Sequence, residues 1–310
     1  MRLYKPKFWD NDKNFFPILL FPLTLLYGLI IFLKKKFTKL SKFNIPIICI
    51  GNIYVGGTGK TPSSILLAKE FSKIGKKPAI IRKFYKNHND EYQLIRKHFK
   101  YLILNKNRIN AINQAAEENF DSIILDDGFQ DYRIKKDLNI ICFNQNQLIG
   151  NGFVFPSGPL RESLSALKNA QIIIINGQKN IEFERKVLSL NRNINIFYSS
   201  YKPINISEFK DKQLLALAGI GNPNNFFDLL SEHGLNVKEK LIFPDHYEFK
   251  NSEILDIINT ANQNNYEIIT TEKDYFRIKS YNFKEIKYLK LELEINDLKK
   301  LIERILKIYD

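Results

Sequence analysis

The most informative part of the chain, Ile45 to Lys73, reads IPIICIGNIYVGGTGKTPSSILLAKEFSK. It begins with a short apolar run bounded by turn residues, which is typical of a buried parallel strand. A glycine-rich turn follows, and then a helical spacing of apolar residues that Gly75 closes. A strand, a glycine loop, Gly-Lys-Thr and a helix in this order are typical of a phosphate-binding loop for nucleoside triphosphates.

The residue types of the loop suit phosphate chemistry. The residues assigned to it are Tyr54, Val55, Gly56, Gly57, Thr58, Gly59, Lys60 and Thr61. Glycines let main-chain N–H groups turn toward phosphates, and the helix N-terminus adds partial positive charge. Lys60 can reach the β- and γ-oxygens of ATP, and Thr61 can offer its hydroxyl to Mg²⁺. The full pattern has glycine where this chain has Tyr54, so a turn that merely joins strand and helix is the alternative.

Length and composition limit the classes of protein. A chain of 310 residues can form one large or two moderate domains. Its 47 Lys and Arg against 33 Asp and Glu give a net charge of +14, which suits nucleic acid, lipid headgroups or phosphorylated substrates. A general bias toward Lys, Asn and Ile is the alternative explanation. Cys49 and Cys142 lie in apolar runs and form no disulfide framework, which fits a reducing cytosol.

A long apolar stretch precedes the loop. Phe15 to Leu33 contains nineteen residues without a charge, and Lys34, Lys35 and Lys36 follow. This is just long enough to cross a bilayer, although two prolines and a glycine interrupt it. Three interpretations stay open: a single membrane span, a monotopic helix lying in the interface, or a core helix of a soluble domain. The lysines would favour anionic headgroups, and they make a cleaved signal peptide a poor match.

Strand-like and helix-like runs alternate along the rest of the chain. Strands are expected at 78–82, 101–105, 122–125, 138–143, 172–175, 194–198, 214–218, 237–243 and 268–269, and helices at 108–118, 222–234, 252–263 and around 298–306. This alternation predicts an α/β fold with a parallel sheet, whose ligands gather at the carboxyl ends of the strands. An Asn- and Gly-rich break at 145–158 suggests a domain boundary. We expect a membrane-associated N-terminal helix region at 1–40 and a phosphate-loop, nucleotide-binding domain at 41–148. A second α/β domain with its linker is expected at 149–290, and a C-terminal strand and helix that pack on the core at 291–310.

A second motif carries acidic groups. The apolar run from Ser122 to Leu125 leads directly into Asp126, Asp127, Gly128, Phe129 and Gln130. Enzymes with a phosphate loop hold their metal ion with acids at such a strand end, directly or through water. Asp126 and Asp127 are therefore candidate Mg²⁺ ligands together with Thr61. A solvated Asp-Asp-Gly turn is the alternative.

Four further segments give these motifs a family context. They are Gly150-Asn-Gly152 with Pro156-Ser-Gly-Pro-Leu-Arg161-Glu162, Ala218-Gly-Ile-Gly-Asn-Pro223, Phe243-Pro-Asp245-His246, and Thr270-Thr-Glu-Lys273-Asp274. Together with the loop and Asp126 to Gln130, in this order and spacing, they resemble the tetraacyldisaccharide 4′-kinase family, the lipid A 4′-kinases. The resemblance covers nearly the whole chain, including the apolar N-terminal stretch.

The resemblance implies a fold, a reaction and a location. It implies a Rossmann-like P-loop NTPase domain joined by a strand linker to a smaller α/β domain. The reaction is ATP-dependent phosphorylation of the 4′-hydroxyl of a tetraacylated glucosamine disaccharide 1-phosphate, giving lipid IVA. The location is the cytoplasmic face of the bacterial inner membrane, with the chain peripheral, monotopic or anchored by one N-terminal span. The implied partners are this lipid and the membrane surface, with no nucleic acid and no obligate protein partner.

The resemblance also implies roles for single residues. Asp90 matches the family's catalytic aspartate, Glu91 a metal-side acid, and His246 the histidine that partners the aspartate. Gln130 matches the end of the acidic motif, while Arg108 and Arg161 match arginines near phosphates. A carboxylate oriented by a histidine is a chemically reasonable base for a sugar hydroxyl. Taken without the family, Asp90 would be a helix N-terminal acid and His246 a turn residue.

The chain departs from the family pattern before Asp90. The family has Arg-Gly-Tyr-Gly and a longer basic loop, where this chain has Arg82-Lys-Phe84-Tyr85 and fewer residues. Phe84 and Tyr85 are both candidates to stack on adenine. Asn89 and Tyr92 flank Asp90 and Glu91 where the family has Gly and Pro.

Three other classes of protein fit less well. A partition-type ATPase has a lysine where this chain has Val55. A membrane-docked ATPase or GTPase switch without a small-molecule acceptor is the main alternative, but Thr271 to Asp274 has the wrong order for a guanine-recognition motif. A nucleic-acid-binding protein would be expected to confine its lysines to one face and to carry a basic-aromatic motif, whereas the lysines here are dispersed.

Overall fold

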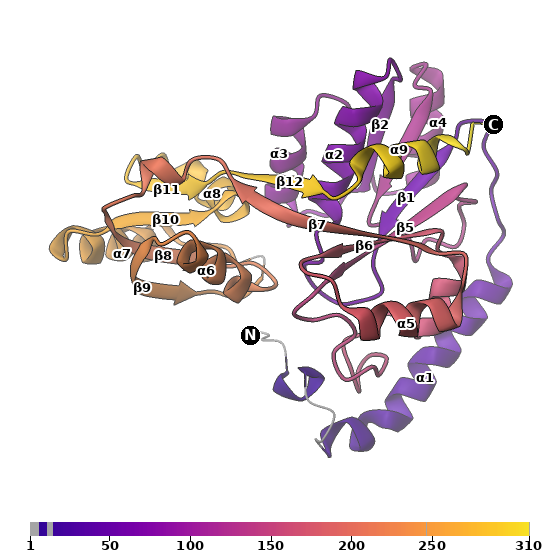
Figure 1. Cartoon of the computed structure of the whole chain (residues 1–310), viewed down its shortest axis with the longest axis horizontal. Coiled ribbons are helices and arrows are strands. Elements are labelled where there is room, and N and C mark those ends of the chain that lie inside the picture. The colour runs from indigo at the N-terminus through magenta and orange to yellow at the C-terminus, as the bar shows by residue number, and fades with distance from the viewer. Residues whose placement is uncertain (1–5, 11–14, 246, 310) are drawn as a thin grey trace. The chain divides into compact units, whose positions relative to one another are not determined.

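The computed structural model describes residues 6–10, 15–245 and 247–309 (Figure 1). Its contacts divide the chain into two compact units. The larger unit comprises the described parts of Lys5–Phe84, Tyr101–Ser200 and Leu293–Asp310, and the smaller one includes Tyr85–Lys100 and Tyr201–Glu292. The α/β class predicted from the sequence is confirmed, and each unit is built around its own sheet.

The larger unit contains an eight-stranded sheet in the order β12-β7-β6-β5-β1-β4-β2-β3. Its strands are β1 (Ile47–Gly51), β2 (Pro78–Lys83), β3 (Leu102–Asn105), β4 (Ser122–Asp126), β5 (Leu138–Asn144), β6 (Ile172–Asn176), β7 (Asn195–Pro203) and β12 (Leu291–Ile295). The pairs from β3 through to β7 are parallel. β1 lies between β4 and β5, so the loop after β1 and the acids after β4 leave the same edge of the sheet.

Apolar residues cover both faces of this sheet. Every residue of β1 and β4 is buried, which agrees with the continuous apolar runs expected of central parallel strands. One face packs against α4 (Arg108–Glu117) and α5 (Ile181–Leu190) in a single hydrophobic cluster. Ile47 and Cys49, which point to this face of the sheet, belong to the cluster. Ile48 points to the opposite face and is equally buried, so both faces of the strand are covered. A rigid parallel sheet therefore supports the loop.

The smaller unit has a four-stranded sheet of its own, in the order β11-β10-β8-β9. The strands are β8 (Gln213–Ala218), β9 (Asn236–Ile242), β10 (Glu267–Thr271) and β11 (Ile286–Leu289), and all three pairs are parallel. α6 (Pro223–Glu232) packs on one set of β8 residues and α7 (Asn251–Gln263) on the alternate set. α3 (Asn89–His98) also belongs to this unit and contacts α8 (Glu272–Ile278).

This division differs from the expected one. The region 149–200, expected in the second domain, supplies β6 and most of β7 to the larger sheet, and residues 85–100 belong to the smaller unit. Main-chain hydrogen bonds explain the placement of the glycine-rich break, because Val55 N donates to Pro159 O at 2.8 Å and Arg161 N to Ile53 O at 2.7 Å. The break is therefore a loop folded against the phosphate loop. The chain changes unit within β7 and near the start of β12.

The apolar N-terminal stretch forms one helix, α1 (Phe16–Phe37), of 22 residues. Among its residues only Pro17 and Thr24 are buried, and twelve large hydrophobic side chains from Phe16 to Phe37 are exposed. This exposure contradicts the interpretation as a core helix. By length and composition α1 could cross a membrane.

The remaining sequence predictions concern single elements. The expected strands and helices all form, with ends shifted by one or a few residues. The C-terminal stripe packs as predicted, since Leu301, Ile302 and Ile305 of α9 (Leu298–Leu306) are buried. The predictions did not locate α3, α5, α8 or β11, whereas the C-terminal strand expected within 291–310 forms as β12. α8 and β11 have only seven and four residues, too few to show a clear apolar period.

Candidate active site

The glycine loop after β1 turns sharply into a helix. Gly56 and Gly59 have φ values of 133° and 87°, a region that side chains rarely adopt. Gly59 is the N-cap of α2 (Lys60–Lys73), so the helix begins at the lysine. Asn52 supports the loop, because its Nδ2 donates to Tyr54 O at 2.6 Å and to Thr58 Oγ1 at 3.1 Å. Sequence reasoning missed Asn52, although it lies at the start of the glycine turn.

Asp126 ends β4 and is the more deeply buried of the two adjacent acids, with no exposed surface. Its carboxylate accepts hydrogen bonds from Thr61 Oγ1 and Ser64 Oγ, both at 3.1 Å, and forms an ion pair with Arg82. Arg82 also donates to Thr61 Oγ1 at 3.1 Å. No sequence pattern pointed to Arg82. It lies opposite Asp126 in the β2–β4 register, a pairing that only the folded sheet establishes.

Asp127 faces the positive groups of the site. Its Oδ1 lies 3.6 Å from Lys60 Nζ and accepts a hydrogen bond from Arg161 at 3.1 Å. Arg108 donates to the main-chain oxygen of Asp127 at 2.7 Å. Burial by itself would raise the pKa of Asp127, but the charges of Lys60, Arg161 and two further arginines outweigh it and hold the pKa well below its usual range. Asp127 is therefore ionised at neutral pH.

Gln130 and the loop ending at Glu162 complete this part of the larger unit. Gln130 Nε2 donates to Asn52 O at 2.8 Å, just before the phosphate loop. Tyr27 of α1 donates to the main-chain oxygen of Arg161 at 3.2 Å, and Lys35 Nζ lies 2.5 Å from Glu162 Oε2. Side chains of α1 therefore contact Arg161, which bonds to Asp127, and its neighbour Glu162.

Asp90 and Glu91 lie in the first turn of α3 in the smaller unit and are 4% and 6% exposed. Arg277 donates to Asp90 Oδ2 from two nitrogens, and Lys273 Nζ lies 2.5 Å from Glu91 Oε1. Tyr92, where the family has Pro, fixes the turn before α3, since its hydroxyl accepts from Tyr85 N at 2.6 Å.

The oxygen donors of the larger unit fit a magnesium ion bound with ATP. In the part of the chain that the structure describes, no three side chains of His, Cys, Asp or Glu gather as a metal-binding group. Mg²⁺ does not require such a group, because it takes one or two carboxylates and completes its shell with phosphate oxygens and water. Thr61, Asp126 and Asp127 offer a hydroxyl and two carboxylates of this kind.

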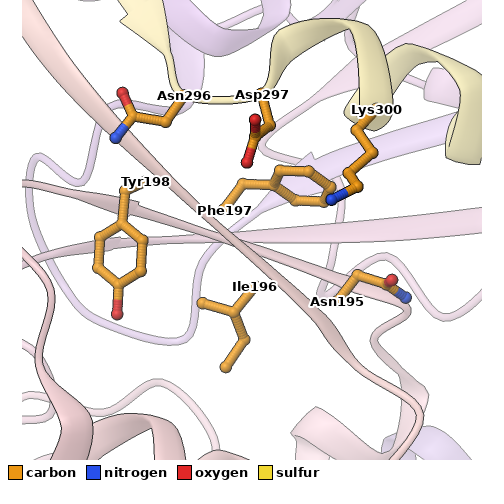
Figure 2. A pocket seen from close by; sticks show the side chains of 7 residues that line it. All are labelled: Asn195, Ile196, Phe197, Tyr198, Asn296, Asp297 and Lys300. Carbon is orange, nitrogen blue, oxygen red and sulfur yellow. The ribbon is translucent and has the colours of Figure 1, made fainter.

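A pocket of about 330 Å³ lies elsewhere in the larger unit. Figure 2 shows its lining side chains, which come from β7, from the turn before α9 and from α9 itself. They are Asn195, Ile196, Phe197, Tyr198, Asn296, Asp297 and Lys300. None of the predicted site residues lines this pocket, and we assign it no role in catalysis.

Comparisons with known proteins connect these clusters to one family. A family model described as LpxK, tetraacyldisaccharide-1-P 4′-kinase, matches residues 16–310. The chain belongs to this family. A tetraacyldisaccharide 4′-kinase of Pelagibacter ubique is 43% identical over 312 residues, covering 99% of both chains. One from Rickettsia canadensis is 33% identical and covers 99% of this chain and 98% of its own.

A solved structure agrees with the fold of the LpxK family. LpxK from Aquifex aeolicus, crystallised in complex with ATP, is 25% identical to this chain with a TM-score of 0.72. The match covers 95% of this chain and 99% of that one. The resemblance inferred from six short motifs is therefore confirmed.

The predicted site residues of this LpxK-family chain fall into two groups. The loop Tyr54–Thr61, Asp126, Asp127, Gln130, Arg108 and Arg161 lie together in the larger unit, whereas Asp90 and Glu91 lie in the smaller one. His246 lies outside the described residues. The two adenine candidates, Phe84 and Tyr85, are 39% and 44% exposed, and the division between the units falls between them.

Proposed function

We propose that the chain transfers the γ-phosphoryl group of ATP to the 4′-hydroxyl of a tetraacylated glucosamine disaccharide 1-phosphate, forming lipid IVA and ADP. The supporting observation is a phosphate loop whose Lys60 and Thr61 contact the two acids after β4, in a chain that matches the kinase family from residue 16 to residue 310.

The larger unit would bind the triphosphate. Main-chain N–H groups of the loop and the N-terminus of α2 would surround the β- and γ-phosphates, with Lys60 contributing a full positive charge. Thr61, Asp126 and Asp127 would hold Mg²⁺, which neutralises charge on the phosphate oxygens when bound. Arg161 and Arg108, which hold Asp127 in place, would add positive charge near the transferred group.

The smaller unit would supply the base. Asp90 would accept the proton of the 4′-hydroxyl while the hydroxyl oxygen bonds to the γ-phosphorus and the bond to the bridging oxygen of ADP breaks. His246 would orient Asp90 and stabilise its ionised form, and Glu91 would act on the metal side. Phosphoryl transfer needs little covalent chemistry from the protein, so positioning of these groups would provide most of the catalysis.

The helix α1 would hold the chain at the cytoplasmic face of the inner membrane, where ATP is available. Its exposed apolar side chains would enter the lipid, and Lys34, Lys35 and Lys36 at its C-terminal end would meet anionic headgroups. The lipid acceptor would then be reached from the membrane surface.

The reaction is tested by incubating the full chain with γ-labelled ATP, Mg²⁺ and the tetraacylated disaccharide 1-phosphate in mixed micelles. We expect label in the lipid, none with Lys60→Ala, and strong loss when the metal is chelated. Label released only as inorganic phosphate, at a rate independent of the acceptor, would instead identify an ATPase switch.

Membrane binding is tested by flotation with vesicles that contain phosphatidylglycerol. Replacing Leu19, Leu26 and Ile30 with Gln removes apolar side chains that are 62%, 56% and 55% exposed, and we expect the chain to leave the vesicles. The matched control is Thr24→Val, because Thr24 is buried and bonds to Ser157 within the larger unit. Unchanged flotation of the triple variant would argue against α1 as the membrane anchor.

A further inference from the structure

The Thr270-Thr-Glu-Lys273-Asp274 motif, to which the proposed reaction gives no role, runs from the end of β10 into the first turn of the short helix α8. This helix contacts α3, the helix that begins with Asp90 and Glu91. Arg277 Nε and Nη2 donate to Asp90 Oδ2 at 2.9 and 2.6 Å. Both donors of the planar guanidinium reach the same oxygen, so they restrict the position of Oδ2 more than a single lysine can.

Arg277 is itself held on its other side. Its Nη1 donates to Asp274 Oδ1 at 2.7 Å and to the main-chain oxygen of Gly219 at 2.5 Å. Asp274 is fully buried and accepts from Thr271 Oγ1 at 2.6 Å and from Gly219 N at 3.0 Å. The guanidinium therefore bridges Asp90 to a rigid corner formed by the ends of β8 and β10.

Arg277 stays protonated although its side chain is only 9% exposed. Burial would lower its pKa, but the carboxylates of Asp274, Asp90 and Asp245 outweigh this and raise the pKa above its usual value. Asp245 Oδ1 lies 3.8 Å from Arg277 Nη2 and directly precedes His246. One cation thus contacts Asp90 and also the residue before His246.

Three further side-chain contacts set the register between α8 and α3. Lys273 Nζ lies 2.5 Å from Glu91 Oε1 in the first turn of α3. At the other end of α3, Lys97 Nζ lies 2.6 Å from Glu272 Oε1 and His98 Nε2 lies 3.1 Å from Glu272 Oε2. These pairs resist sliding or rotation of α3, so the side chain at position 90 keeps its place.

We propose that Arg277 is a positioning residue for phosphoryl transfer, which orients the Asp90 carboxylate through a guanidinium anchored on Asp274 and Gly219. This assigns the Thr270–Asp274 motif to alignment of the base rather than to nucleotide binding. The inference rests on the proposed role of Asp90 as the proton acceptor. It needs no contact of Arg277 with either substrate.

The experiment compares steady-state kinetics of Arg277→Met and Arg277→Lys with those of Lys287→Met in the same micellar assay. Lys287 is the matched control, because it forms an ion pair with Glu267 on the same unit but is exposed and lies on β11. We expect Arg277→Met to lower kcat about 100-fold with little change in the KM for ATP, because a misplaced reacting group costs about this much. Arg277→Lys should recover part of kcat, since it restores charge without the two-donor geometry.

A double variant separates positioning from stability. If Arg277 acts through Asp90, Arg277→Met added to Asp90→Asn should leave kcat no lower than Asp90→Asn alone. A further drop equal to that of the single Arg277 variant would overturn the proposal, as would an Arg277→Met enzyme with the kinetics of Lys287→Met. If Arg277→Met does not fold, the same comparison is made with Arg277→Lys, alone and combined with Asp90→Asn. Full kcat in Asp90→Asn would refute the role of Asp90, and failure to label the lipid at all would refute the kinase itself.

Discussion

The phosphate loop of the larger unit differs from the charged side chains where α3 meets α8 in the smaller unit. We call the second group, Asp90, Glu91, Lys273, Asp274 and Arg277, the α3–α8 cluster. In the proposed function the loop would bind phosphates mainly through its main chain. Lys60 and Thr61 are adjacent in sequence, and Asp127 follows β4, the strand that neighbours β1. In the α3–α8 cluster, Asp90 and Arg277 are 187 residues apart and neutralise each other. In our proposals, the first arrangement would attract a charged ligand, whereas the second would position one carboxylate.

The difference predicts how each region responds to substitution. Loss of a loop charge should weaken stabilisation of the phosphates, and it should do so wherever the base lies. Loss of a charge in the α3–α8 cluster should leave ATP binding intact and reduce turnover. Kinetic constants can therefore distinguish the two regions.

The largest effect is expected at the loop. Lys60→Ala should reduce lipid phosphorylation by about 1,000-fold, because a preorganised charge on the transferred group is lost in a site shielded from water. The measurement is transfer of label from ATP, together with circular dichroism to show that the variant is folded. Near wild-type turnover would contradict the assignment of the loop.

Asp90→Asn and His246→Gln should each lower kcat by about 100-fold or more, with the KM for ATP nearly unchanged. Each removes part of one acid–imidazole pair, so the double variant should lose clearly less than the sum of the two effects. The check is a double-mutant cycle on kcat. Fully independent effects would contradict a working pair and would weaken the contrast between the two regions.

Arg82→Met tests whether the buried acid of the larger unit depends on its partner. Asp126 has no exposed surface, so removing Arg82 leaves a buried charge and should cost about 3–5 kcal/mol of the free energy of unfolding. Arg161→Met removes a 29% exposed partner of Asp127 and should cost less than about 1 kcal/mol. Urea denaturation measures both. Equal losses of unfolding free energy in the two variants would show that burial of the acid does not control the cost of removing its partner.

Gly219→Ala should have a moderate effect on turnover through the α3–α8 cluster. A Cβ at this position would lie 3.0 Å from Asp274 Oδ1 and 3.3 Å from Phe243 Cβ, so Asp274 or its neighbours must shift by tenths of an ångström. We expect kcat to fall about tenfold, since small displacements of positioned groups reduce the rate. A rise in the KM for ATP with unchanged kcat would argue that this corner serves nucleotide binding instead.

The smallest effect concerns acid stability of the larger unit. Burial raises the pKa of Asp131, but Arg133 and Arg108 outweigh it and lower the pKa below its usual value. The stabilisation from this carboxylate is therefore complete above the unfolded pKa near 4 and is lost as the pH falls through the lower folded pKa. Asp131→Asn should lose less stability than the wild type between about pH 6 and pH 3, measured by urea midpoints. An identical loss would exclude Asp131 as a contributor.

Several features could be predicted because they depend on residues that are neighbours in sequence. The strand, glycine loop and helix around Lys60 form one continuous stretch, and Asp126 and Asp127 directly follow an apolar run. Most strands and the long helices could also be located, because burial in a parallel sheet requires apolar runs. Only the resemblance to a family pointed to Asp90, and no sequence signal pointed to Arg82 or Arg277 as partners of acids.

The amino-acid sequence alone determined the α/β class, the phosphate loop and the family, since each depends on short-range patterns and on their order along the chain. Tertiary structure decided which strands share a sheet, that the 150–162 segment lies against the loop, and that α1 leaves its apolar side chains exposed. It also decided which cation holds each buried acid. Such pairing depends on distances between residues far apart in the chain, and these distances exist only after the sheets have formed.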